Sequence, residues 1–238
     1  MTSSDHSFKQ YDAELETLRG RVMQMGGLVQ IQIMTAIDAF IGGNHELMEK
    51  VIADDHRVNG LEVAIDEECT QIIVKRQPAA NDLRMVMAVS KIVTDLERIG
   101  DEAAKIARIA KMIMQRDHLS TPRIGYVREI GDISLGMLRG VLDAFARLDA
   151  VKAAVIIRED QAIDEKFRGI MRQLITYMLE DPRTITSAFD IVFIAKAIER
   201  IGDHAKNIAE SVIYIVKGKD VRHIALDQLE HTAYSTTS

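Results

Sequence analysis

The stretch Glu97-Arg98-Ile99-Gly100-Asp101 occurs a second time, residue for residue, as Glu199-Arg200-Ile201-Gly202-Asp203. A second segment repeats as well, because Ala36-Ile-Asp-Ala-Phe40 matches Val141-Leu-Asp-Ala-Phe145 at an offset of 105 positions. Five identical residues at corresponding places in two halves indicate an internal duplication.

Apolar residues recur every three or four positions through nearly the whole chain, which is the pattern of amphipathic helices. Helix-breaking residues such as Gly42-Gly43-Asn44 and Asp181-Pro182 separate the periodic segments. The sequence predicts an all-α protein of two tandem, similar three-helix bundles at 13–118 and 124–218, followed by an irregular C-terminal tail at 219–238. Residues 1–10 are expected to be irregular too. The predicted helices are 13–42, 45–76, 81–116, 125–148, 151–180 and 184–217.

Composition excludes several classes of function. The chain has 238 residues and a formal net charge of −6, so it offers no basic field for nucleic acid. The single cysteine, Cys69, rules out a disulfide framework and a cysteine zinc site, and its place among apolar residues indicates a core thiol. The sequence shows neither a secretory signal nor an apolar stretch long enough to cross a bilayer, so we expect a cytoplasmic protein.

Both acids of the repeated motif lie on one helix face, because residues four apart point the same way. At about 100° per residue, Glu97 and Asp101 flank the apolar stripe and face the surface of the bundle. Folding the chain back at Pro78 sets Asp101 opposite Asp55 and Glu97 opposite Asn59. The equivalent fold at Asp181 and Pro182 forms the second set of facing residues. The two candidate clusters are therefore Asp55, Asn59, Glu97 and Asp101, and Asp160, Asp164, Glu199 and Asp203. Glu62 and Asp66 continue the first stripe by further turns and are additional candidate ligands.

These clusters suggest cation binding. Like charges four residues apart destabilise a helix by about 0.2–0.5 kcal/mol per pair, and two facing pairs repel further unless a cation neutralises them. Oxygen ligands without thiolates suit Mg²⁺, Mn²⁺, Ca²⁺ or iron. Ordinary ion pairs are the alternative, because Lys105 follows Asp101 by four residues and Lys196 precedes Glu199 by three.

Other features favour structure over chemistry. Gly100 and Gly202 lie in mid-helix, where glycine costs about 1 kcal/mol relative to alanine, so close helix packing is the favoured explanation. His56 and His204 each follow a cluster aspartate but point about 100° away from it, and we expect them on the surface. A Glu-x-x-His signature, a phosphate-binding glycine loop and a nucleophile–base pair are all missing from the sequence, so no enzyme is predicted.

Several motifs together resemble the PhoU family of bacterial phosphate-specific transport regulators, and the resemblance runs from about Glu14 to His223. The motifs are Arg76-Gln-Pro78, Asn81-Asp-Leu-Arg84, Asp95–Asp101, Leu142-Asp-Ala-Phe145 and Ile198–Asp203. The resemblance implies paired three-helix bundles, often assembled as a homodimer, and multinuclear clusters of iron or zinc at (Glu/Asp)-x-x-x-Asp pairs. Glu97/Asp101, Glu199/Asp203 and Asp160/Asp164 match that pattern. Asp55-x-x-x-Asn59 departs from it and loses one charge, so the first site is expected to be the weaker one.

The resemblance also implies a function. Family members restrain the phosphate-starvation (Pho) regulon and phosphate uptake, as non-enzymatic adaptors between the ATP-hydrolysing subunit of the phosphate ABC transporter and the phosphate sensor histidine kinase. Such a protein reaches the inner membrane only through its partners and binds no nucleic acid. The alternative is a metal-dependent hydrolase or an iron-handling helical protein that uses the carboxylate clusters, with iron, zinc, magnesium or manganese as the metal.

Overall fold

The computed structural model describes residues 3–116 and 125–235, with side chains from Tyr11 onward. Every regular element in these ranges is a helix, and the six predicted helices are confirmed to within a few residues, apart from an earlier start of the first. The predicted linker between the copies, near 117–124, lies outside the described residues. The elements are α1 (Ser3–Gly42), α2 (His45–Arg76), α3 (Ala80–Gln115), α4 (Gly125–Arg147), α5 (Ala150–Glu180), the 3₁₀ turn η1 (Pro182–Thr184), α6 (Ile185–Lys217) and α7 (Leu226–Tyr234).

The turn between the first two helices of each copy is built in the same way. The Asn44 side chain accepts a 3.1 Å hydrogen bond from the Leu47 backbone N–H and so caps α2, and Asp149 caps α5 through Lys152 at 2.9 Å. These caps satisfy backbone donors that a helix start leaves without partners. Because Asn44 and Asp149 are 105 positions apart, the duplication extends to the connections.

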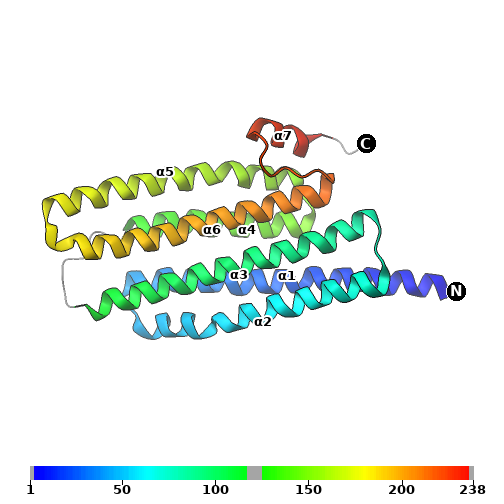
Figure 1. The fold of residues 1–238 in the computed structure, drawn as a ribbon, viewed down its shortest axis with the longest axis horizontal. Coiled ribbons are helices and arrows are strands. Elements are labelled where there is room, and N and C mark those ends of the chain that lie inside the picture. Colours follow the sequence, from blue (N-terminus) through cyan, green and yellow to red (C-terminus); the bar gives the residue numbers. More distant parts are fainter. Residues whose placement is uncertain (1–2, 117–124, 236–238) are drawn as a thin grey trace.

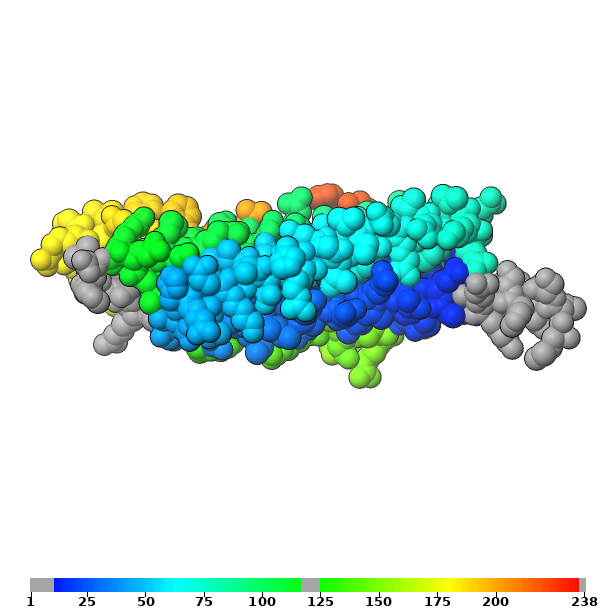
Figure 2. All heavy atoms as spheres, turned by 90° about the horizontal axis from the view of Figure 1, so that it is seen from below, coloured from blue at the N-terminus to red at the C-terminus, as the bar shows by residue number. Residues whose placement is uncertain are grey.

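The two copies, α1–α3 and α4–α6, share one hydrophobic core. Helices α3 and α6 run side by side along the middle of the molecule, with α1 and α4 behind them and α2 and α5 at the two outer edges (Figure 1). The buried apolar residues of all six long helices form a single continuous cluster. The result is an elongated rod, as Figure 2 shows, in which neither copy buries its apolar face alone.

Helix α1 is apolar enough, over Tyr11–Gly42, to meet the length and composition criteria for crossing a membrane. The sequence-based statement that no stretch reaches this length was therefore wrong. Half of that apolar window is buried inside the bundle, where α1 packs against α2, α3 and α4. Core helices of water-soluble proteins meet the same criteria, so the apolar face of α1 is explained by packing.

The prediction of irregular ends was also wrong. Residues from Ser3 onward belong to α1, and the tail contains α7, which packs against α5. Val221, Leu229 and Ala233 are buried, and Arg158 of α5 forms an ion pair with Glu230 of α7. Three apolar contacts spaced along a polar segment are enough to hold it, although they are too few to give a clear periodic signal.

Candidate cation-binding sites

The repeated glycine brings the acidic residues of adjacent helices together. A Cβ atom on Gly100 would lie 3.3 Å from Val58 and 3.7 Å from Oδ1 of Asp55, and one on Gly202 would lie 2.6 Å from Cδ1 of Ile163 and 3.7 Å from Oδ1 of Asp160. The predicted close packing at both glycines is therefore confirmed. In each copy an aspartate on the second helix, Asp55 on α2 or Asp160 on α5, faces the glycine inside the motif.

The first cluster joins Asp55 of α2 to Glu97 and Asp101 of α3. Burial, and after it the charge of Asp101, raises the pKa of the Asp55 carboxyl. Burial, Asp101 and Glu62 in turn raise the pKa of Glu97. The predicted proximity of Asp55 and Asp101 is thus confirmed, and Glu62 is a further member of the set.

Glu62 occupies the place that sequence reasoning assigned to Asn59. Asn59 is exposed and makes no hydrogen bond to the acids within the described part of the chain. Long helical side chains lean toward the N-terminus of their own helix. In an antiparallel pair, Glu62 on α2 and Glu97 on α3 therefore lean toward each other, whereas the shorter Asn59 cannot reach. The first cluster accordingly holds four carboxylates: Asp55, Glu62, Glu97 and Asp101.

Two buried polar side chains meet beside this cluster. Oδ1 of Asp55 and the amide of Gln32 are buried, and a hydrogen bond from Gln32 lowers the pKa of Asp55 against the larger effect of burial. Gln32, on α1, is only 6% exposed, and its Oε1 lies 3.1 Å from the position of a Cβ on Gly100. Gln32 therefore supplies Asp55 with a neutral partner from α1 and no positive charge.

The second cluster is more deeply placed than the sequence predicted. Asp160 is 6% and Glu199 8% exposed, so the expectation of a surface site was wrong for this copy. Because α5 packs closely against this face of α6, both carboxylates are covered. Burial, and after it Glu199 and Asp160, raises the pKa of Asp203 to about 6, and Asp164 contributes less. All four predicted acids therefore lie near one another.

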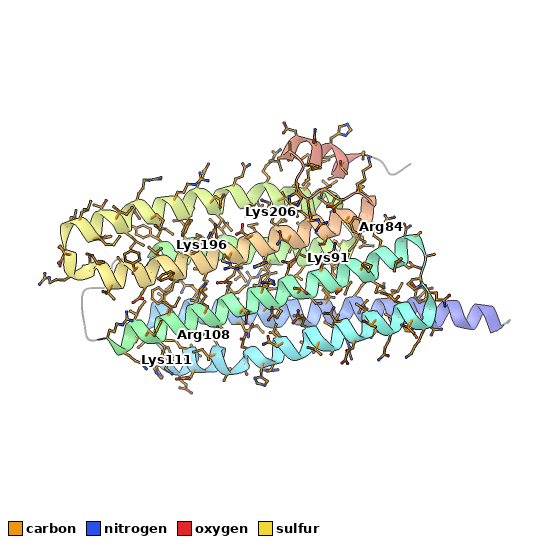
Figure 3. All side chains as sticks on the ribbon, viewed as in Figure 1. Arg84, Lys91, Arg108, Lys111, Lys196 and Lys206 are labelled. Atoms are coloured by element: carbon orange, nitrogen blue, oxygen red, sulfur yellow. The ribbon has the colours of Figure 1, made fainter. Side chains whose placement is uncertain are left out.

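Two lysines neutralise the second cluster from within. Nζ of Lys206 donates to Oδ2 of Asp160 at 2.9 Å, and Nζ of Lys196 donates to Oε1 of Glu199 at 2.6 Å. Figure 3 shows both lysines on α6. Among the carboxylate oxygens of this cluster, only Oε2 of Glu199 is buried without a hydrogen-bond partner in the described residues. The alternative of an ordinary ion pair, drawn from the sequence for Lys196 and Glu199, is thus confirmed.

The first copy lacks these lysines. At the motif offset of 102, Lys196 corresponds to Thr94 and Lys206 to Ala104. At the offset of 105, Glu62 corresponds to Phe167, whose ring lies 5.5 Å from Nζ of Lys196. Sequence reasoning missed these differences, although a comparison of the two copies at the two offsets reveals them.

Three other side chains differ from expectation or confirm it. Lys105 forms its ion pair with Glu102, at 3.1 Å, and not with Asp101 as the sequence suggested. Glu102 also forms an ion pair with Arg200 of the second copy. His204 is not on the surface: its Nδ1 lies 2.8 Å from Oδ1 of Asp95 on α3, so it links the two copies. Cys69 is buried as predicted, and burial raises the pKa of its thiol to about 12.

The carboxylate oxygens of the first cluster are suitable ligands for a hard cation, although their side chains do not surround a common point in this structure. In the described ranges 3–116 and 125–235, no three His, Cys, Asp or Glu side chains are arranged to hold a metal ion. The mutual repulsion of the acids around Asp55, which raises the pKa of that carboxyl after burial does, is what a divalent cation would relieve. The carboxylate oxygens suit hard cations such as Mg²⁺, Ca²⁺ and Mn²⁺.

Comparison with known proteins matches both copies to one family. The model of the PhoU domain matches residues 22–110 and again 127–212. The chain is 48% identical, over 225 residues, to the phosphate-specific transport system accessory protein PhoU of Escherichia coli (strain K12), which covers 94% of this chain and 92% of that protein. It is 46% identical to a homolog of that protein from Pseudomonas aeruginosa, over 94% of this chain and 93% of the other.

Solved structures agree with this match. The crystal structure of PhoU from Pseudomonas aeruginosa superposes with a TM-score of 0.83 at 45% identity, over 88% of this chain and all of that one. The phosphate transport system regulatory protein PhoU from Streptococcus pneumoniae gives a TM-score of 0.82 at 29% identity, over 89% and 99% of the two chains. The duplicated helical architecture is therefore shared across a wide range of sequence identity.

Proposed function

Because this chain belongs to the PhoU family, we propose that it is a regulatory accessory protein of bacterial phosphate transport. The observation that carries the proposal is the full-length match to a phosphate-specific transport system accessory protein, at 48% identity over 94% of the chain. Identity at this level over both copies includes the helices that carry the acidic clusters.

The finer role that we propose is that of a non-enzymatic adaptor. When phosphate is plentiful, the protein restrains the ATP-hydrolysing subunit of the phosphate ABC transporter and holds the phosphate sensor histidine kinase in its inhibitory state. It acts in the cytoplasm as a homodimer and reaches the membrane through these partners. A rod with two related faces, one in each copy, suits a protein that contacts two partners.

A deletion of the gene tests this role. In phosphate-rich medium, loss of the protein should release the phosphate-starvation response, so that alkaline phosphatase activity rises. Complementation with the intact gene should return the activity to its low level. Unchanged low alkaline phosphatase in the deletion strain would refute the regulatory role.

We further propose that the acidic clusters bind divalent cations as structural elements of the adaptor. Asp55, Glu62, Glu97 and Asp101 would hold a cation in the first copy, and Asp160, Asp164, Glu199 and Asp203 would hold one in the second. In the first copy the cation would stand where the second copy has the bonded lysines Lys196 and Lys206. Elemental analysis of the purified chain, beside the variants Glu97→Ala/Asp101→Ala and Glu199→Ala/Asp203→Ala, tests whether each cluster retains metal, and equal metal content in all three proteins would argue against cation binding.

The alternative function, a metal-dependent hydrolase or an iron-handling protein, makes a different prediction. A chain loaded with metal should then hydrolyse a phosphoester or consume ferrous iron. The regulatory proposal expects neither activity, and both assays can be run on the same preparation as the elemental analysis.

A further inference from the structure

A groove of about 770 Å³ lies between the two copies, beside the second acidic cluster, with which it shares Lys206. Its walls come from α3, α6 and the segment between α6 and α7. Lys91 of α3 and Lys206 of α6, both labelled in Figure 3, lie on two of the walls, and Arg222 of the following segment closes the third. Three cations thus face one polar space from three separate elements.

Each of these cations keeps hydrogen-bond donors to offer. Lys206 uses one of its three N–H groups on Asp160, and Arg222 bonds Asp220 through Nε and Nη2, which leaves Nη1. Lys91 forms no ion pair within the described residues and lies 5.9 Å from the ring centre of Tyr214. The hydroxyl of Ser211 adds a neutral donor to the lining.

Acids around the groove offset much of its positive charge, because Lys206 and Arg222 are paired with Asp160 and Asp220, so the groove offers hydrogen-bond donors more than net charge. Asp95 is already engaged, since its Oδ1 accepts a 3.2 Å hydrogen bond from Asn207 and lies 2.8 Å from Nδ1 of His204. Burial raises the pKa of Glu210 to about 7, against the lowering effects of Lys206 and Arg222. Below about pH 7 the protonated Glu210 therefore carries no charge and becomes a donor itself, whereas above it the carboxylate adds a negative charge to the groove.

We propose that this groove binds a phosphate group, carried by inorganic phosphate or by a phosphorylated small molecule. A phosphate group presents several acceptor oxygens in different directions, which matches donors that converge from three elements. The volume lies in the range of small-molecule sites, about 300–1,000 Å³, so an attached organic group also fits. Bound there, the ligand ties both copies to the segment that leads into α7.

Isothermal titration of the full chain with inorganic phosphate and, separately, with adenosine monophosphate tests the proposal. Binding of either ligand supports it, and the tighter one identifies the source of the phosphate group. Lys91→Gln, which breaks no ion pair in the described residues, should weaken binding about tenfold. Lys166→Gln on α5 is the matched control, because it removes the same charge from an exposed pair with Glu129. If neither ligand binds, or if both variants bind like the wild type, the proposal is refuted.

Glu210→Gln tests the proposal in the opposite direction, because it should strengthen phosphate binding where Lys91→Gln weakens it. At pH 8 the Glu210 carboxylate repels an anion, so the neutral glutamine should tighten binding severalfold, whereas general damage to the groove would weaken it. The charged groups that face Glu210 are Lys206 on α6, Asp95 on α3, and Asp220 and Arg222 beyond α6. Because these remain in the variant, tighter binding reports the removal of one charge, and weaker binding overturns the assignment. The proposed role in phosphate transport does not require this groove, so the gene-deletion test stands apart from it.

Discussion

Lys206 donates a 2.9 Å hydrogen bond to the carboxylate of Asp160, and the corresponding position of the first copy is Ala104. One substitution between duplicated helices thus separates a cluster with a lysine bonded to its aspartate from one whose acids feel only the more distant charges of Arg98 and Arg108. Lys196, which replaces Thr94, reinforces the difference through Glu199. The two copies share a backbone arrangement and differ in how their carboxylates are neutralised.

Replacement of Lys206 by methionine should lower the free energy of unfolding, because it removes the ion pair with Asp160. Asp160 would keep its burial and lose its ion pair, and a charged hydrogen bond of this kind contributes about 1–2 kcal/mol after allowance for the partly exposed lysine. Urea unfolding in the presence of a chelator should show that loss. Lys166→Met removes a solvent-exposed pair with Glu129 and should change stability by less than about 0.5 kcal/mol. Equal effects of the two variants would mean that Lys206 contributes no more than a surface charge.

Cation affinity should be greater in the first copy than in the second. Its four carboxylates have no lysine bonded to them, whereas a cation in the second copy must compete with Lys196 and Lys206. Titration with Mn²⁺ should show that Asp55→Asn/Glu62→Gln lowers affinity about tenfold more than Asp160→Asn/Asp164→Asn, although each pair removes two charges. If the second-copy variant loses more affinity instead, the first site is the weaker one, as the sequence predicted from the missing charge at Asn59.

The helices and the duplication could be predicted from the sequence because both depend on local pattern. Apolar spacing sets each helix, and caps such as Asn44 and Asp149 mark where helices begin. The sequence also predicts that Asp55 lies near Asp101, because in an antiparallel helical hairpin the facing positions are found by counting residues outward from the turn.

Other features depend on side-chain reach or on contacts between distant segments. Spacing identifies Glu62 as an additional candidate, but that it takes the place of Asn59 depends on the direction in which a long side chain leans. His204 meets Asp95 only because α6 packs against α3, and that contact joins residues 109 positions apart. The groove requires, in addition, the segment at Arg222, which looked irregular in sequence.

Stability should depend on pH through Glu210. Its pKa is about 7 in the folded chain and near 4.5 when unfolded, so between these values the folded state binds more protons. The free energy of unfolding should therefore fall as pH rises from about 4.5 to about 7, and this contribution should level off above pH 7. Glu210→Gln should remove this part of the profile and stabilise the chain at pH 8 by about 1 kcal/mol, after allowance for partial exposure. Thermal unfolding measured from pH 5 to pH 8 checks the difference between the two curves, and parallel curves would contradict it.

Gly202→Ala should destabilise the protein even though alanine is the better helix former. Alanine gains about 1 kcal/mol of helix propensity, but its Cβ would lie 2.6 Å from Cδ1 of Ile163, and overpacking of a tight contact costs about 1–3 kcal/mol. Gly136→Ala on α4 is the matched control, because nothing lies within 4 Å of its Cβ position, and it should stabilise the chain by about 0.5–1 kcal/mol. Ile163→Val removes the clashing methyl group, so the double variant Gly202→Ala/Ile163→Val should recover part of the loss. Chemical denaturation of the three variants decides the matter: if Gly202→Ala is as stabilising as Gly136→Ala, close packing is not the reason for glycine in the repeated motif.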